Sequence, residues 1–253
     1  MNYNIQIIDK KDMAEFVRQH HYSSVMPRIT KVAYGGFKED ELKAAVSFGY
    51  GSRPLHTIRA IFPALGTQDY LEIGKLCLED SEPKNSESWF LSRAFKILAK
   101  QQPDLKLIFS WADGMWGKPG LIYQASNFLY GGFIWTDAYQ MADGKRLHPL
   151  QIQSFLSSQG IVTEQRTNRP TLETLERIGW KHFKGKQFRY ARFLRECDRQ
   201  SPFEWSTNFP KIEDCEWLER TANGWLACKK PHFTGTWWWL ILVVYIESEK
   251  GGA

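Results

Sequence analysis

The sequence lacks the cysteine patterns that mark disulfide-bonded secreted domains and zinc sites. Its four cysteines, Cys77, Cys197, Cys215 and Cys228, form no Cys-x-x-Cys pair and stand at no zinc-ligand spacing with a histidine pair. A secretory signal is also missing from the N-terminus. We therefore expect free thiols, no structural zinc and a cytoplasmic location.

Other signatures are missing as well. There is no GxxxxGK[ST] loop to indicate nucleoside triphosphate chemistry, no internal repeat and no low-complexity tract. The apolar run Trp237 to Ile246 has only ten residues, about half of what a helix needs to cross a bilayer. We expect a buried strand in that run and no membrane partner.

What the chain does contain is typical of a globular protein. Of its 253 residues, 43% are hydrophobic and 24% are charged, which is enough apolar material for a core. Aromatic residues reach 15%, with 11 tryptophans. Such rings fill cores, and they also stack on nucleic-acid bases, so their abundance alone does not separate the two uses.

The net charge of +5 is concentrated in one stretch. Between residues 177 and 199, eight cations face only Glu196 and Asp198; they are Arg177, Lys181, Lys184, Lys186, Arg189, Arg192, Arg195 and Arg199. A local cluster of this kind suits a polyanion such as DNA. A solvated basic face explains the charge equally well.

The first 140 residues alternate between strand and helix patterns. We expect strands at 3–8, 31–37, 42–49, 70–78, 105–112 and 133–141, and helices at 9–20, 86–101 and 121–128. Residues 54–63 have no clear pattern and are compatible with a further strand. Helices at 149–158 and 171–178 and a strand at 186–194 follow.

This order predicts an α/β (α+β) fold, an open mixed sheet flanked by helices. Ligands of such sheets tend to bind beyond the carboxyl ends of strands, and Asp113 follows a buried strand at such an end. The loop EDSEPKNSES joins a strand to a helix N-terminus, where backbone N–H groups favour an anion such as pyrophosphate. Lys84, Asn85, Ser86 and Ser88 add donors there.

Two further segments carry candidate catalytic groups. In GLIYQASNFLYGGF, Tyr123 lies on a short helix after a buried strand. The segment resembles the GNAT acyltransferases, in which a tyrosine at this place protonates the thiolate of coenzyme A; a core tyrosine is the alternative. In HHYSSVMP, adjacent histidines and a tyrosine suit proton transfer or metal ligation, although a histidine pair in a loop is more often surface.

Four segments in the same order resemble the phage Mom family of adenine carbamoylmethylation proteins. They are HHYSSVMP, NSESWFLSRAF, FSWADGMWGKPGLIYQASNF and KGKQFRYARFL, and the resemblance runs from about residue 20 to about residue 194. It implies a GNAT-like fold, acetyl-CoA as a ligand, and the N6 amino group of adenine in double-stranded DNA as the target. It also implies a role in protecting phage DNA from host restriction, in the host cytoplasm.

The resemblance assigns residues by position. His21, Tyr22, Asp113 and Tyr123 match the family's catalytic positions, and Ser88 its polar helix start. Lys75 stands where relatives have an arginine, which keeps the charge but loses the bidentate fork. A carbamoylmethyl group cannot be built by simple acyl transfer, and a redox metal would supply the missing chemistry. The same four residues offer N and O ligands for iron.

DNA would then contact the basic stretch. We expect the target adenine to be flipped out of the duplex, with Lys181, Lys184, Lys186, Arg189 and Arg192 at the phosphates. The resemblance predicts a catalytic domain over residues 1–200, including the basic segment 177–199, and an extension over residues 201–253. The alternatives are a GNAT enzyme acetylating a protein or small-molecule amine, and a non-catalytic DNA-binding module.

Overall fold

A computed structural model describes residues 2–21, 26–51, 54–147, 149, 152–158, 160 and 169–235. The chain divides into two compact units. The first contains Met1–Ala112, Gly120–Phe133 and Phe188–Pro210, and the second contains Asp113–Pro119, Ile134–Gln187 and Lys211–Ala253. The long strands β6 (Leu129–Gln140) and β8 (Lys181–Phe193) contribute residues to both units. Each unit is described by itself.

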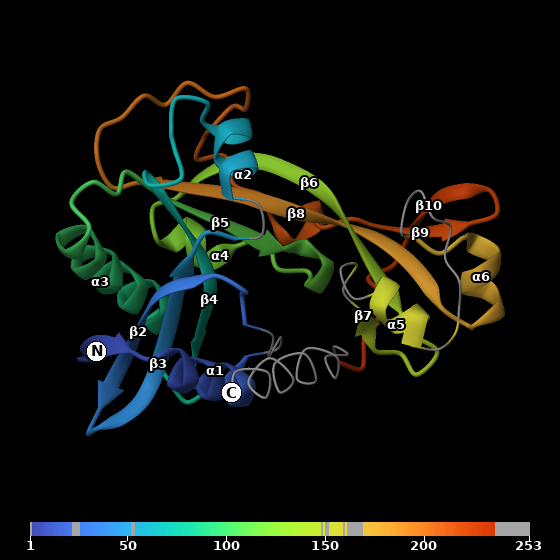
Figure 1. The fold of residues 1–253 in the computed structure, drawn as a ribbon, viewed down its shortest axis with the longest axis horizontal. Helices are drawn as coiled ribbons and strands as arrows, with labels where there is room; N and C mark the ends of the chain where they lie inside the picture. The colour runs from blue at the N-terminus through green and yellow to red at the C-terminus, as the bar shows by residue number, and fades with distance from the viewer. Residues whose placement is uncertain are drawn as a thin grey trace, which may run out of the picture. The chain divides into compact units, whose positions relative to one another are not determined.

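The first unit is built on a mixed sheet with helices on its faces (Figure 1). Its strands run in the order β1-β2-β3-β4-β5-β8-β6; the first four are antiparallel neighbours and β4 pairs with β5 in parallel. The further elements of this unit are β1 (Asn4–Ile8), α1 (Lys10–His20), β2 (Thr30–Lys38), β3 (Glu41–Gly49), α2 (Pro54–Ile61), β4 (Tyr70–Leu78), α3 (Ser86–Gln101), β5 (Leu107–Asp113) and α4 (Leu121–Ala125). The predicted open mixed sheet flanked by helices is confirmed.

Helices α1 and α3 cover opposite faces of this sheet. The buried face of α1 packs in one cluster with Ala45 of β3. Its start is set by Asp9, whose side chain accepts the N–H of Asp12. Phe90 of α3 lies against Gly36, which pairs with Ala44 across β2 and β3. Because neighbouring residues on a strand point to opposite faces, the two helices must lie on different sides.

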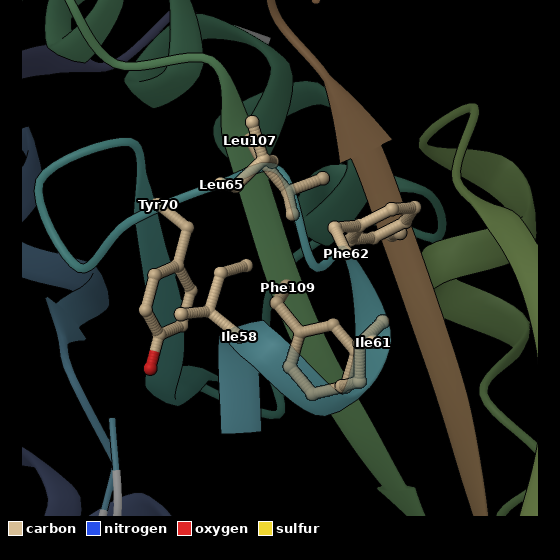
Figure 2. Packing of buried hydrophobic residues seen from close by; sticks show 8 residues of the cluster. Ile58, Ile61, Phe62, Leu65, Tyr70, Leu107 and Phe109 are labelled. Carbon is tan, nitrogen blue, oxygen red and sulfur yellow. The ribbon is translucent and has the colours of Figure 1, made fainter. Parts of the chain in front are cut away.

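The stretch after β3 is a helix rather than a strand, so that expectation was wrong. Proline is well suited to the first turn of α2, where its missing N–H costs no helical hydrogen bond. Ile58, Ile61 and Phe62 fall at helical spacing and pack on Tyr70 and on β5 (Figure 2). The apolar contacts with β4 and β5 stabilise this short helix, which local pattern alone did not reveal.

The predicted bounds of α3 are confirmed, whereas the end of α4 differs from the prediction. The N-cap of α3 is Asn85, in the left-handed conformation at φ 71°, and Ser86 is the buried first residue of the helix. Asparagine tolerates the left-handed conformation better than most residues, so it can turn the chain into the helix at this position. Helix α4 ends at Ala125, and β6 begins at Leu129, before the predicted start at Phe133.

The second unit has its own apolar core. Tyr139, Leu147, Leu156, Leu175 and Trp180 are buried together in it. Besides its parts of β6 and β8, it contains η1 (Gly114–Trp116), β7 (Arg146–Leu147), α5 (Ile152–Ser158), α6 (Leu172–Arg177), η3 (Ile212–Asp214) and the hairpin β9 (Trp217–Thr221) and β10 (Gly224–Cys228). Thr171 caps α6, because its side chain accepts the N–H of Thr174.

The C-terminal part of the chain is divided between the units. Ser201 to Pro210 belong to the first unit, and the hairpin β9–β10 belongs to the second. A functional division at residue 200 stays a prediction. Residues 237–246, for which we expected a strand, lie outside the described residues. No helix in the described part of the chain has the length and apolar character that crossing a membrane requires.

Candidate active site

Strands β4 and β5 separate after a short paired stretch. They pair in parallel at Tyr70↔Leu107, Leu71↔Ile108 and Glu72↔Phe109, and no further pairing joins them within their described lengths. The register of β3 against β4 also shifts, so that Gly74 lies in a bulge. We call the opening between 73–78 and 110–112 the β4–β5 fork. Backbone groups that lack a strand partner on these two edges can hydrogen-bond a ligand.

Tyr123 is placed in the first unit by aromatic packing. Its ring centroid lies 5.1 Å from that of Tyr190 and 5.3 Å from that of Phe128. The preceding turn needs a glycine at position 120. Gly120 has φ +99°, and a Cβ added there would lie 2.6 Å from the Tyr190 ring. Burial raises the pKa of Tyr123, the Ser110 hydroxyl opposes that rise, and the charge of Glu72 adds to it. The phenol therefore stays protonated at neutral pH.

Glu72 is a candidate that the sequence analysis missed. It occupies the last paired position of β4 before the fork, and burial raises its pKa to about 7. A Cβ on Gly51 would clash with Glu72 Oε2, so the glycine makes room for this carboxylate. Among the described residues it has no cationic partner. An acidic residue inside the apolar strand YLEIGKLCL was the available signal.

Asp113 ends β5, as predicted, and belongs to the second unit. One carboxylate oxygen accepts the N–H of Met115 at 3.1 Å, which caps η1. The other lies 2.8 Å from Nη1 of Arg146, a buried guanidinium. The carboxylate is thus already neutralised by a cation within its own unit.

His21 follows α1 in the first unit, where its backbone N–H donates to the carbonyl of Val17. Tyr22 lies outside the described residues. No three His, Cys, Asp or Glu side chains of the described part gather as metal ligands. Both oxygens of Asp113 have protein partners, so the described residues do not fit an iron site.

The predicted anion-binding residues lie at the start of α3. Asn85 and Ser88 line a hollow of about 350 Å³, and Ser88 Oγ donates to the Asn85 carbonyl at 3.1 Å. Arg93 and Lys96 extend the hollow along the same helix face and were missed. Arg93 follows Trp89 by four residues and Lys96 follows Ser92 by four, a spacing that places each pair on one face. Ser86 is buried, and Lys84 is exposed outside the lining.

Lys75 lies on β4 beside the bulge, where its backbone N–H donates to Ser47 Oγ at 3.0 Å. Ser110, on β5 at the opposite edge of the fork, has a fully buried Oγ that makes no hydrogen bond of normal geometry in the described structure, although it lies near enough to the Tyr123 phenol to oppose the rise of its pKa. A buried hydroxyl without a partner is unfavourable in the free protein and points to a ligand that completes it.

The predicted phosphate-binding residues have partners within their own units. In the second unit, Lys181 pairs with Glu219 at 3.1 Å, Lys186 pairs with Glu216 at 2.7 Å, and Lys184 lies 4.3 Å from the centroid of the Trp225 ring. In the first unit, Arg192 donates to the Ser126 carbonyl. Lys186 and Arg189 are buried, Lys184 and Arg192 are half-buried, and Lys181 is exposed. Phosphate binding stays a prediction, and exposure favours Lys181 and Lys184.

Arg189 is 5% exposed. Its Nη1 donates to the Gly131 carbonyl at 2.6 Å, and its guanidinium lies 3.8 Å from the centroid of the Phe203 ring. As predicted from the alternation of the strand, it points away from Phe188 and Tyr190, which pack with Tyr130.

Known structures and sequences resemble this chain. An acetyltransferase from Salmonella typhimurium with acetyl-CoA has 9% identity, covering 80% of this chain and 99% of its own, with a TM-score of 0.41. A GNAT family N-acetyltransferase from Escherichia coli in complex with CoA has 8% identity, covering 51% of this chain and 69% of its own, with a TM-score of 0.38. Likeness at this level carries no functional conclusion.

The sequence comparisons are more specific. The methylcarbamoylase Mom of Escherichia phage Mu is 26% identical over 186 residues, which cover 73% of this chain and 72% of that protein. The model of the Mom protein family matches residues 2–211, a span of 210 of the 253 residues. Because that match covers well over half of its length, the chain belongs to the Mom protein family.

Proposed function

We propose that this chain is a DNA-modification enzyme that attaches a carbamoylmethyl group to N6 of adenine in phage DNA and so protects it from restriction. The match to the Mom family over residues 2–211 carries the proposal. It includes the fork, Asp113 and Tyr123. The name of the phage Mu relative, a methylcarbamoylase, supports the nature of the transferred group.

The fork suits acetyl-CoA as a source of the two-carbon unit. The unpaired edges of β4 and β5 could hydrogen-bond the amide groups of its pantetheine arm, and the buried Ser110 hydroxyl lacks the partner that such an amide would supply. Arg93 and Lys96 beside the start of α3 could bind its phosphates. Bound there, acetyl-CoA would supply the two carbons of the group. The amide would form when an ammonia-level nitrogen donor displaces the thiol of coenzyme A, and the bond from the methyl carbon to N6 would also require a two-electron oxidant.

Proton transfer would be divided between two residues with opposite properties. Adenine N6 loses a proton when it forms a new bond to carbon, and a carboxylate whose pKa lies near 7 is suited to accept it. We assign that role to Glu72. The phenol of Tyr123, whose pKa is raised by desolvation, stays protonated and can give its proton to a leaving thiolate.

The target adenine must leave the base stack before its amino group can react. Flipping a base costs a few kcal/mol, which contacts with the protein must offset. The duplex is therefore the proposed partner, and Lys181 and Lys184 are its proposed phosphate contacts.

The test is to express the chain in a bacterial host, digest the host DNA to nucleosides and weigh the adenine fraction. A mass increase matching a carbamoylmethyl group is expected in the wild type. Tyr123→Phe should keep its fold, because the ring contacts remain, and lose about 10²-fold or more of the modification rate. A mass increase matching an acetyl group, or acetylation of an amine with unmodified DNA, would favour the GNAT alternative. Normal DNA binding by an inactive Asp113→Asn variant would exclude the purely binding alternative.

A further inference from the structure

The first unit contains a groove that the reaction as described above does not use. It lies between β6 and the segment 202–208, which is joined to β6 by paired hydrogen bonds between Tyr130 and Ser206. Its volume is about 550 Å³, in the range of small-ligand sites. We call it the aromatic groove; its lining includes Tyr130, Gly132, Phe133, Arg189, Phe203 and Asn208.

The wall formed by the segment 202–208 is firmly anchored. Trp205 stacks on Phe62 with ring centroids 5.1 Å apart, and its Nε1 donates to Ser201 Oγ at 2.9 Å. A Cβ on Gly131 would clash with the Trp205 ring, so the glycine allows the wall to close on β6. A groove with such fixed walls is preformed for a ligand and does not have to be ordered on binding.

The floor of the groove carries a buried cation without an anionic partner. Arg189 is 5% exposed, and its hydrogen bonds go to the backbone carbonyls of Gly131 and Phe133. No carboxylate within the described residues forms an ion pair with it. Burying a charge without a counter-charge is costly, and an anion entering the groove would remove that cost.

The other groups of the groove suit a planar, polar ligand. Phe133 is 40% exposed at one side, and Phe203 forms the face on which the guanidinium rests. Glu204 and Asn208 lie at the exposed rim, where a carboxylate and an amide can hydrogen-bond the amino and ring nitrogen groups of a base. An aromatic surface beside a cation is the combination that binds unpaired nucleotides.

We propose that the aromatic groove holds one unpaired nucleotide of a DNA strand, with its base against Phe133 and its phosphate at Arg189. This inference rests on the proposed function, which requires a nucleotide to leave the duplex. The groove would hold the extruded nucleotide or a neighbour of it. This placement does not depend on what binds in the fork.

The test measures binding of a fluorescently labelled single-stranded oligodeoxynucleotide to the full-length protein. Phe133→Ser should raise the Kd about tenfold, because the variant can no longer stack a base on the ring. The same variant should bind an oligonucleotide of abasic sites as the wild type does. Ile134→Ser is the matched control, because Ile134 is exposed to a similar degree on the same strand but does not line the groove, and its Kd should not change.

A second variant tests the phosphate contact. Arg189→Met keeps much of the side-chain volume and removes the charge, so the dependence of log Kd on log salt should fall by about 0.7, the value for one phosphate of a single strand. A merely structural role would change the melting temperature and leave this slope unaltered. Unchanged binding in Phe133→Ser, or equal weakening in Ile134→Ser, would overturn the groove proposal.

Failure of the two proposals can be distinguished. If wild-type protein leaves cellular adenine unmodified but Phe133→Ser still weakens oligonucleotide binding, the proposed reaction is wrong and the nucleotide groove is supported. If the wild type modifies adenine and Phe133→Ser binds and modifies DNA equally well, the groove proposal alone is wrong.

Discussion

At the scale of single residues, the first unit partly or fully buries three polar groups whose charge or hydroxyl is not fully compensated within the described structure. Glu72 lacks a cation, Arg189 lacks a carboxylate, and Ser110 Oγ lacks any hydrogen bond in the described structure. Each of these costs free energy in the ligand-free fold. Groups of this kind gather at functional sites, which is why all three enter the proposals.

Glu72 should make the stability depend on pH. Its pKa is about 7 in the folded protein and about 4.5 when unfolded, so the folded state binds more protons between these values. Stability contributed by this group is therefore full below about pH 4.5 and lost as pH rises through 7. At pH 8 the free energy of unfolding of Glu72→Gln should exceed that of the wild type by on the order of 2 kcal/mol, so the variant should unfold at a higher denaturant concentration.

At pH 4.5 the wild type and Glu72→Gln should unfold at the same urea concentration. Urea titrations at the two pH values measure the difference. An equal gap at both values would show that Glu72 does not titrate as we infer.

Ser110→Ala should separate ligand binding from stability. Removing a buried hydroxyl that makes no hydrogen bond of normal geometry should cost little, so the melting temperature should stay the same or rise. If the hydroxyl bonds a ligand in the fork, the KM for acetyl-CoA should rise about five- to tenfold. A clear loss of thermal stability with unchanged KM would contradict this interpretation.

At the scale of elements, an ion pair stabilises the turn that follows β5. Asp113 caps η1 and pairs with Arg146 of β7, both within the second unit. The charge of Asp113 therefore contributes to the fold of this unit as well as to any chemistry.

Asp113→Asn should leave the buried guanidinium of Arg146 without its anion and cost roughly 1–3 kcal/mol of unfolding free energy. Thermal or chemical unfolding followed by tryptophan fluorescence measures the loss. The double variant Asp113→Asn, Arg146→Met is the control, and it should recover part of the stability because neither charge is left unpaired. A single variant as stable as the wild type would show that the pair contributes nothing.

At the scale of the whole molecule, the excess of positive charge is not spread freely over the surface. Cations of β8 that the sequence grouped together are separated into ion pairs, a cation–π contact and a buried guanidinium. Their use for DNA therefore depends on how exposed each one is.

The double variant Lys181→Ala, Lys184→Ala should bind duplex DNA more weakly at every sequence. The slope of log binding constant against log salt should fall by about 1.8, or 0.9 for each phosphate that no longer has a lysine beside it. Arg177→Ala, a cation of the same segment on α6, is the control and should leave the slope unaltered. An unchanged slope in the double variant would place the phosphate-binding surface elsewhere.

Local sequence patterns determined much of the secondary structure of this protein. Strands β1 to β5 and helices α1 and α3 follow from apolar periodicity, and Asp9 and Thr171 cap helices as expected, because these features depend on neighbours along the chain. The family, the position of Asp113 at a strand end and that of Tyr123 on a short helix were also evident from motifs.

Tertiary structure alone decided the rest. The helix at Pro54–Ile61 depends on packing against β4 and β5, and the fork depends on where those two strands stop pairing. Glu72 and Arg189 are ordinary charged residues in the sequence. They become unusual because the fold surrounds them with residues that are distant along the chain, and no described residue supplies a counter-charge. A local sequence pattern does not contain this information.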